Sequence, residues 1–118
     1  MRFWMIDKCA KEGRIMYKFS NDHTVQLSVV VPENESDVFR LYGVYDITVE
    51  RGSTASIGYD TEGRWRLGVV TKRTKNSIHI SSGAMMWVFP KCVCSFRPGT
   101  DVCLCVTLVE EHVGDLSA

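Results

Sequence analysis

Residues 68–108 read GVVTKRTKNSIHISSGAMMWVFPKCVCSFRPGTDVCLCVTL, and this stretch decides the fold class. β-Branched and aromatic residues alternate with polar ones, while Asn76, Gly83, Pro90 and Gly99 divide the stretch into short segments. Alternation with a period of two, interrupted by turn residues, predicts β-strands joined by tight connections. A strand, a basic turn, two further strands, a connection and a long strand suit a small five-stranded barrel.

The residues before this stretch have the same character. Apolar side chains recur with period two in residues 14–19 and 24–29, and Pro32 ends the second of these runs. Residues 38–49 form another strand-rich run, which Gly43 interrupts. Because no amphipathic helix pattern is present, the sequence predicts an all-β protein.

A weak internal repeat relates the two halves of the chain. Residues 13–15 align with 68–70, residues 24–27 with 77–80, and residues 45–49 with 102–106. We therefore expect two small five-stranded barrels in tandem, in residues 1–59 and 60–112, followed by a tail in residues 113–118. One larger β-barrel or sandwich is the alternative.

Composition and charge narrow the classes of function. The 118 residues are 45% hydrophobic and 24% charged, as in an ordinary globular domain, and the formal net charge is zero. The charge is unevenly distributed along the sequence. Residues 60–100 contain seven basic and two acidic residues, a local balance of +5. Residues 20–59 hold six acidic and two basic residues, a balance of −4. Such a distribution indicates an electrostatic footprint, self-association or a mixed solvated surface.

The second unit resembles a known family in four short motifs. These are Gly68-Val69-Val70, Ser77–Ile80, Trp87–Pro90 and Arg97–Val102, which resemble the S1/cold-shock branch of the OB superfamily. Two such units in tandem are similar to the barrels at the N-terminus of piRNA-pathway helicases. The resemblance implies OB-like barrels in an RNA-related, RNA-silencing setting. The Lys-Gly-Phe-Gly-Phe run of the cold-shock motif is absent, so the resemblance favours a barrel repurposed for protein contacts.

The first functional hypothesis is a non-catalytic protein-interaction or scaffold module. Residues 102–109 are apolar on both faces, so the outer face is expected to pack against something. Trp65 lies between two arginines just after a predicted turn, and tryptophan is a frequent anchor at protein interfaces. We predict a surface for a protein partner or a second copy of the chain at these residues: Trp65, Cys103, Cys105 and Val109.

The alternative hypothesis is binding of single-stranded RNA or DNA. Lys72, Arg73 and Lys75 form a basic turn that could hold phosphates. Base stacking would then depend on Trp87, Phe89 and His79, in place of the missing cold-shock aromatics.

Five cysteines allow three interpretations. Cys92 and Cys94 are two residues apart, as are Cys103 and Cys105, so each pair shares one face of a strand. If the two segments paired directly, four thiols would converge as a zinc site requires. Buried inert thiols are the plainer interpretation, and a disulfide or redox role is the third.

Nothing in the sequence indicates an enzyme. The three histidines, at positions 23, 79 and 112, are far apart, and the nine glycines are isolated turn or bulge residues. We expect no catalytic site and no cofactor. The chain lacks an apolar run of membrane-spanning length, and Asp7 and Lys8 interrupt the apolar start. We therefore expect no membrane partner and an intracellular location, in the cytoplasm rather than the nucleus.

Overall fold

The structure is a computed structural model that describes residues 1–21, 25–35, 43–53 and 62–109. Its regular elements are strands, apart from one short 3₁₀ turn at residues 33–35, which confirms the all-β prediction. In chain order they are β1 (Arg2–Lys11), β2 (Arg14–Ser20), β3 (Gln26–Pro32), β4 (Val44–Arg51), β5 (Glu62–Arg73), β6 (Ser77–Ser82), β7 (Met85–Pro90) and β8 (Asp101–Leu108).

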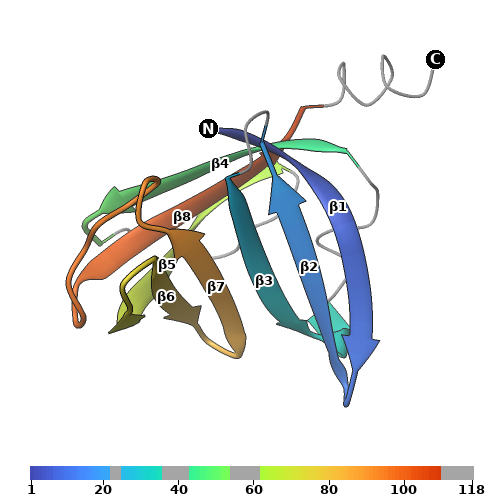
Figure 1. Cartoon of the computed structure of the whole chain (residues 1–118), viewed down its shortest axis with the longest axis horizontal. Coiled ribbons are helices and arrows are strands. Elements are labelled where there is room, and N and C mark those ends of the chain that lie inside the picture. Colours follow the sequence, from blue (N-terminus) through green and yellow to red (C-terminus); the bar gives the residue numbers. More distant parts are fainter. Residues whose placement is uncertain (22–24, 36–42, 54–61, 110–118) are drawn as a thin grey trace.

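The eight strands close into a single antiparallel barrel in the order β1-β2-β3-β7-β6-β5-β8-β4 (Figure 1). Two barrels in tandem are therefore a wrong prediction, and the alternative of one larger barrel is confirmed. The reason is that strands of the two halves pair with each other, β3 with β7 and β4 with β8. The predicted boundary between residues 59 and 60 and the predicted tail, residues 113–118, lie outside the described residues.

The two halves nevertheless repeat the same strand order. The first contributes β4-β1-β2-β3 and the second β8-β5-β6-β7, and each order is that of a four-stranded Greek key. The halves join edge to edge, with Val29 opposite Trp87 at one seam and Thr48 opposite Cys105 at the other. Of the three aligned pairs of segments, only residues 45–49 and 102–106 lie in equivalent strands, β4 and β8, and these two strands are neighbours. The other two alignments match β2 with β5 and β3 with β6, which are not equivalent in this order.

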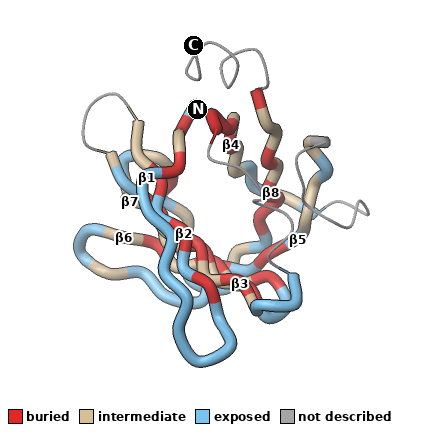
Figure 2. The backbone as a smooth tube through the Cα atoms, turned by 90° about the vertical axis from the view of Figure 1, so that its right-hand side faces the viewer, coloured by how far each residue is buried: buried red, intermediate tan, exposed pale blue. Residues whose placement is uncertain are grey.

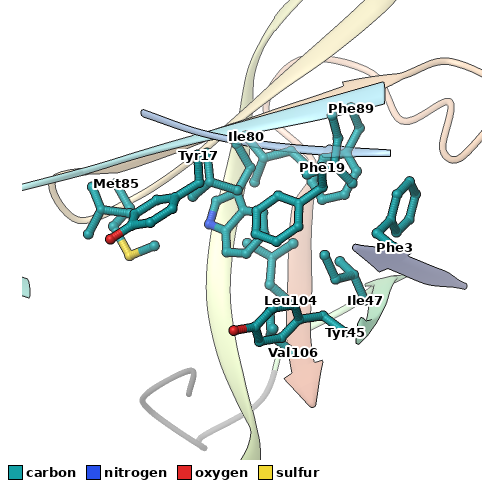
Figure 3. Packing of buried hydrophobic residues seen from close by; sticks show 14 of the residues in the cluster. Phe3, Tyr17, Phe19, Tyr45, Ile47, Ile80, Met85, Phe89, Leu104 and Val106 are labelled. Atoms are coloured by element: carbon teal, nitrogen blue, oxygen red, sulfur yellow. The ribbon is translucent and has the colours of Figure 1, made fainter. Parts of the chain in front are cut away.

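Inward side chains fill the barrel. Alternate residues of β2, β3, β6 and β7 are buried (Figure 2). The largest of these side chains, Trp87, is fully enclosed. The core takes aromatic rings from both halves, Phe19 and Tyr45 from the first and Trp87 and Phe89 from the second. Phe19 is edge-on to Tyr45 at a centroid distance of 5.6 Å (Figure 3). Burial of apolar surface on this scale is the main stabilising contribution to the fold.

Candidate functional site

Because packed side chains occupy the interior of the barrel, we look for a binding site on its outer surface. Trp87 and Phe89, predicted to stack on bases, are both fully buried and pack on each other with ring centroids 5.9 Å apart. Their planes differ by 8°. Neither ring is accessible to a base while the barrel is closed, so the outward side chains of the described strands are the ones to consider for a ligand.

Strand β5 places three apolar side chains on the outer surface, while its Val70 lies in the core. Trp65, Leu67 and Val69 point outward, and Leu67 and Val69 are 41% and 38% exposed. The register places Trp65 opposite Cys105 of β8, and Leu67 opposite Cys103. Together these five residues form a continuous apolar and thiol surface on two adjacent strands, which we call the β5–β8 face.

The inward side of β5 explains why the strand faces this way. Gly68 lies inward, where an added Cβ would be 2.8 Å from Cγ2 of Ile80 and 3.2 Å from the carbonyl oxygen of Ser81. A larger residue would therefore clash. Arg66 is also inward and donates two hydrogen bonds to Ser82. One runs from Nε to the Ser82 Oγ (2.7 Å), and the other runs from a terminal nitrogen to the Ser82 carbonyl oxygen (3.1 Å). Arg66, Gly68 and the buried Val70 thus hold the inward positions, and Trp65, Leu67 and Val69 remain outside.

The two thiols of the β5–β8 face, on β8, each donate a hydrogen bond to a backbone carbonyl. Cys103 Sγ donates to the carbonyl oxygen of Gly52, and Cys105 Sγ donates to that of Gly63, both at 3.2 Å. Cys103 is only 6% exposed, and burial raises the pKa of its thiol, with Glu50 and Asp101 acting in the same direction. These bonds connect β8 to the chain on either side of residues 53–62, so they hold the two thiols in place beside Trp65 and Leu67.

The four predicted partner-binding residues differ in accessibility. Trp65 is half-buried on the outer surface, and Cys105 lies beside it with intermediate exposure. Val109 is 9% exposed, and its amide donates to the carbonyl oxygen of Val44. Leu67 and Val69 were missed as surface residues because period two does not say which face of a strand points inward. The inward glycine and arginine on the other face were the available signal.

The predicted convergence of four thiols does not occur. The neighbours of β8 are β4 and β5, and the segment that contains Cys92 and Cys94 pairs with neither thiol of β8. Cys94 belongs to the core, where burial, with a smaller contribution from Cys92, raises the pKa of its thiol to about 11. In the part of the chain that the structure describes, no three His, Cys, Asp or Glu side chains are grouped as metal ligands would be.

A second surface lies at the turn between β5 and β6. Lys72, Arg73 and Lys75 are exposed there, and the amide of Lys91 donates to the carbonyl oxygen of Asn76. The loop that contains Arg97 joins the same end of β5, because the amide of Gly99 donates to the carbonyl oxygen of Val70. Among the described residues, no ion pair holds any of these cations. We call these five residues the basic end: Lys72, Arg73, Lys75, Lys91 and Arg97.

His79 lies next to the basic end on the outer side of β6. It is paired with Lys72 on β5 and with Val88 on β7, and its Nε2 is 3.4 Å from Oγ of Ser77. His79 is therefore close to the predicted phosphate-binding lysines, whereas the predicted stacking rings are inside the barrel. The other two histidines, at positions 23 and 112, lie outside the described residues.

Comparison with known proteins adds no family to this description. No protein-family model matches the chain, and no curated protein is recognisably similar to it. The closed antiparallel barrel is compatible with an OB-like barrel at the level of architecture. Among the described residues, no helix is long and apolar enough to cross a membrane. The fold and its surfaces thus define an all-β barrel whose accessible chemistry lies on its outer wall.

Proposed function

We propose that this barrel is a non-catalytic protein-interaction module that serves as a scaffold in an RNA-related assembly. The observation that supports the proposal is the β5–β8 face, where Leu67 and Val69 expose large fractions of their side chains beside Trp65. Contiguous apolar surface rimmed by polar residues is typical of protein interaction sites. The RNA-related setting rests on the S1/cold-shock resemblance of residues 68–102.

The partner in this proposal is a protein that covers Trp65, Leu67 and Val69 with apolar side chains. Glu50 and Asp101 lie on one flank of the face and Arg64 on another, so the rim is mixed in charge. A mixed rim around an apolar centre suits a protein surface better than a phosphate backbone. Trp65 is the expected anchor, since tryptophan is enriched among the residues that dominate binding energy.

Photo-crosslinking from single positions tests the proposal. A benzophenone amino acid at Leu67 is expected to form adducts in cells, whereas the same group at Gln26, an exposed residue of β3, is not. The double substitution Leu67→Glu with Val69→Glu should abolish co-purification of the crosslinked protein, and Gln26→Glu should leave it unchanged. Light scattering of the purified chain identifies the case in which the partner is a second copy. Equal crosslinking from both positions would contradict the proposal.

Single-stranded nucleic acid is the second candidate, and the basic end supports it. Five cations from three segments meet there without an ion pair in the described residues. Because the tryptophan and phenylalanine of β7 are buried, binding would depend on phosphate contacts and would be weak and salt-sensitive. The logarithm of the binding constant should fall with the logarithm of salt concentration, with a slope of about −0.7 per phosphate contacted.

Fluorescence anisotropy with a labelled single-stranded RNA tests this second candidate. The double substitution Lys72→Glu with Lys75→Glu should abolish binding at low salt, while Lys11→Glu, at a different hairpin, should leave it intact. Failure of the unmodified protein to bind at low salt would eliminate the candidate and leave the protein-interaction proposal untouched.

A further inference from the structure

A hollow on the outer wall lies on strands that take no part in the β5–β8 face. It has a volume of about 300 Å³, and the residues that line it come from β1, β2, β3, β7 and the turn between β1 and β2. They are Cys9, Lys11, Glu12, Arg14, Met16, Val30 and Met86. We call this feature the methionine hollow.

Strand register builds the apolar floor of the methionine hollow. Met16 is paired with Cys9 on one side and with Val30 on the other, and Val30 is paired with Met86. The four residues therefore form one row across four adjacent strands. Met16 is 39% exposed, and Val30 and Met86 have intermediate exposure.

Methionine gives this floor particular properties. Its unbranched side chain adapts to the shape of a ligand, and its sulfur makes favourable contacts with aromatic rings. Two methionines and a valine in one row thus suit an aromatic side chain better than a fixed aliphatic shape. A hollow of about 300 Å³ is at the lower limit for small-ligand sites and can accept a single large side chain.

The lip of the hollow carries two cations in an unfavourable arrangement. Lys11 and Arg14 are directly opposite each other at the end of the β1–β2 ladder, and like charges in opposing positions destabilise a hairpin. Within the described residues neither has an ion pair, and Glu12 in the turn between them pairs with neither. An incoming carboxylate between the two cations would remove this repulsion.

We propose that the methionine hollow is an anchor site for a partner polypeptide that presents an aromatic residue next to an acidic one. The aromatic ring packs on Met16, Val30 and Met86, and the carboxylate lies between Lys11 and Arg14. The site shares no residue with the β5–β8 face, so the proposal stands or falls independently of the proposed function. It defines a second contact surface on the opposite part of the outer wall.

Methionine methyl NMR tests the proposal with internal controls. The protein is labelled with ¹³C at its five methionine methyl groups and titrated with the capped peptide Gly-Ser-Trp-Asp-Ser-Gly. The methyl signals of Met16 and Met86 should shift in a saturable way, with a dissociation constant on the order of 1 mM. Those of Met5 and Met85, which are 6% and 1% exposed, should not move, which also reports that the fold is intact.

Matched peptides and variants separate the two parts of the site. Replacement of the peptide tryptophan by alanine should abolish the shifts, and replacement of its aspartate by lysine should weaken binding by roughly two- to fivefold, as expected for one partly exposed ion pair. Arg14→Glu should reverse this preference between the two charged peptides, and Gln26→Glu should not. Absence of shifts at Met16 and Met86, or equal binding of the aspartate and lysine peptides, would overturn the proposal.

Discussion

Trp65 and Trp87 are identical in chemistry, and the barrel gives them opposite environments. Trp87 is fully enclosed and packs face to face with Phe89, whereas Trp65 lies half-buried on the outer wall beside Cys105. Their roles differ accordingly. Trp87 contributes to stability through its buried area, and Trp65 has surface available for a partner.

Truncation of the two tryptophans should therefore have unequal effects on stability. We expect Trp87→Ala to lower the free energy of unfolding by about 3–5 kcal/mol, because a large cavity opens among core residues that relax only partly. Trp65→Ala should lower it by about 1 kcal/mol and leave the far-ultraviolet circular dichroism unchanged. Urea denaturation measures both values, and similar losses in the two variants would contradict the assignment of inner and outer faces.

Buried titratable groups with raised pKa values, Tyr45, Cys94 and Cys103, predict loss of stability at alkaline pH. Burial, followed by the effect of Tyr17, raises the pKa of Tyr45 from 10.0 to about 12, and burial raises that of Cys94 from 9.0 to about 11. Below pH 9 both the folded and the unfolded chain hold these protons, so the contribution to stability is complete. Above it the unfolded chain releases its protons first, and the free energy of unfolding should fall as pH rises toward 11 and then 12.

Urea denaturation at successive pH values between 9 and 12 measures this loss. Cys94→Ala should make the fall between pH 9 and 11 less steep, because one of the titrating groups is removed. Cys9→Ala, at an exposed position on β1, serves as the control and should leave the slope unchanged. A rise in stability over this range would contradict the buried, protonated state of Tyr45 and Cys94.

At the scale of elements, the ladders that join neighbouring strands of the barrel differ in length. β4 and β8 share seven residue pairs, whereas β1 and β4 share three and β3 and β7 also share three. A short ladder has fewer hydrogen bonds to break, so it opens at a lower free-energy cost than a long one. The barrel is therefore expected to open first where β1 meets β4 or β3 meets β7.

Hydrogen exchange should reveal this order. Within Arg2–Trp4 of β1 and Ser28–Val30 of β3, the amides that face β4 and β7 should exchange faster than the amides hydrogen-bonded between β4 and β8. The protection of these last amides should approach that of global unfolding. Exchange followed by NMR gives each amide separately. Uniform protection around the barrel would show that the short ladders are as stable as the long one.

At the scale of the whole molecule, two half-barrels of equal strand order complete each other. Each half alone would leave two strand edges without partners, β3 and β4 in the first and β7 and β8 in the second. Exposed edges of this kind are prone to pair with other chains. Neither half can enclose the shared core, which takes side chains from both.

Separate expression of residues 1–59 and 60–118 tests this dependence. Each fragment alone should lack a cooperative unfolding transition, because half of the apolar surface would have no partner to cover it. An equimolar mixture should recover strand signal in circular dichroism and a single transition near that of the intact chain. Two fragments that each unfold cooperatively would instead indicate two independent domains.

Prediction from the sequence succeeded where the signal was local. Period two and turn residues identified strands in each half, and Pro32 and Pro90 end β3 and β7 as a missing amide donor requires. It failed at the partners of these strands. The sequence similarity of residues 45–49 and 102–106 indicated equivalent places in two barrels, whereas these segments are neighbours in one.

The candidate sites were predicted in part for the same reason. Trp65 and the basic turn were expected at the surface and are there, but Trp87 and Phe89 are inside, and the surface role of Leu67 and Val69 was missed. Alternation separates the two faces of a strand without saying which is inward. For β5 the choice depends on the close approach of Ile80 to Gly68, which is a contact between strands.

The sequence by itself determined the all-β class and the approximate positions of the strands and turns. These properties depend on side-chain periodicity and turn chemistry within a few residues. Only the tertiary structure decided that the halves close one barrel, that β8 lies between β4 and β5, and which apolar side chains remain outside. These properties depend on pairing between distant strands, where several registers satisfy the same local pattern and shared burial of the core selects one.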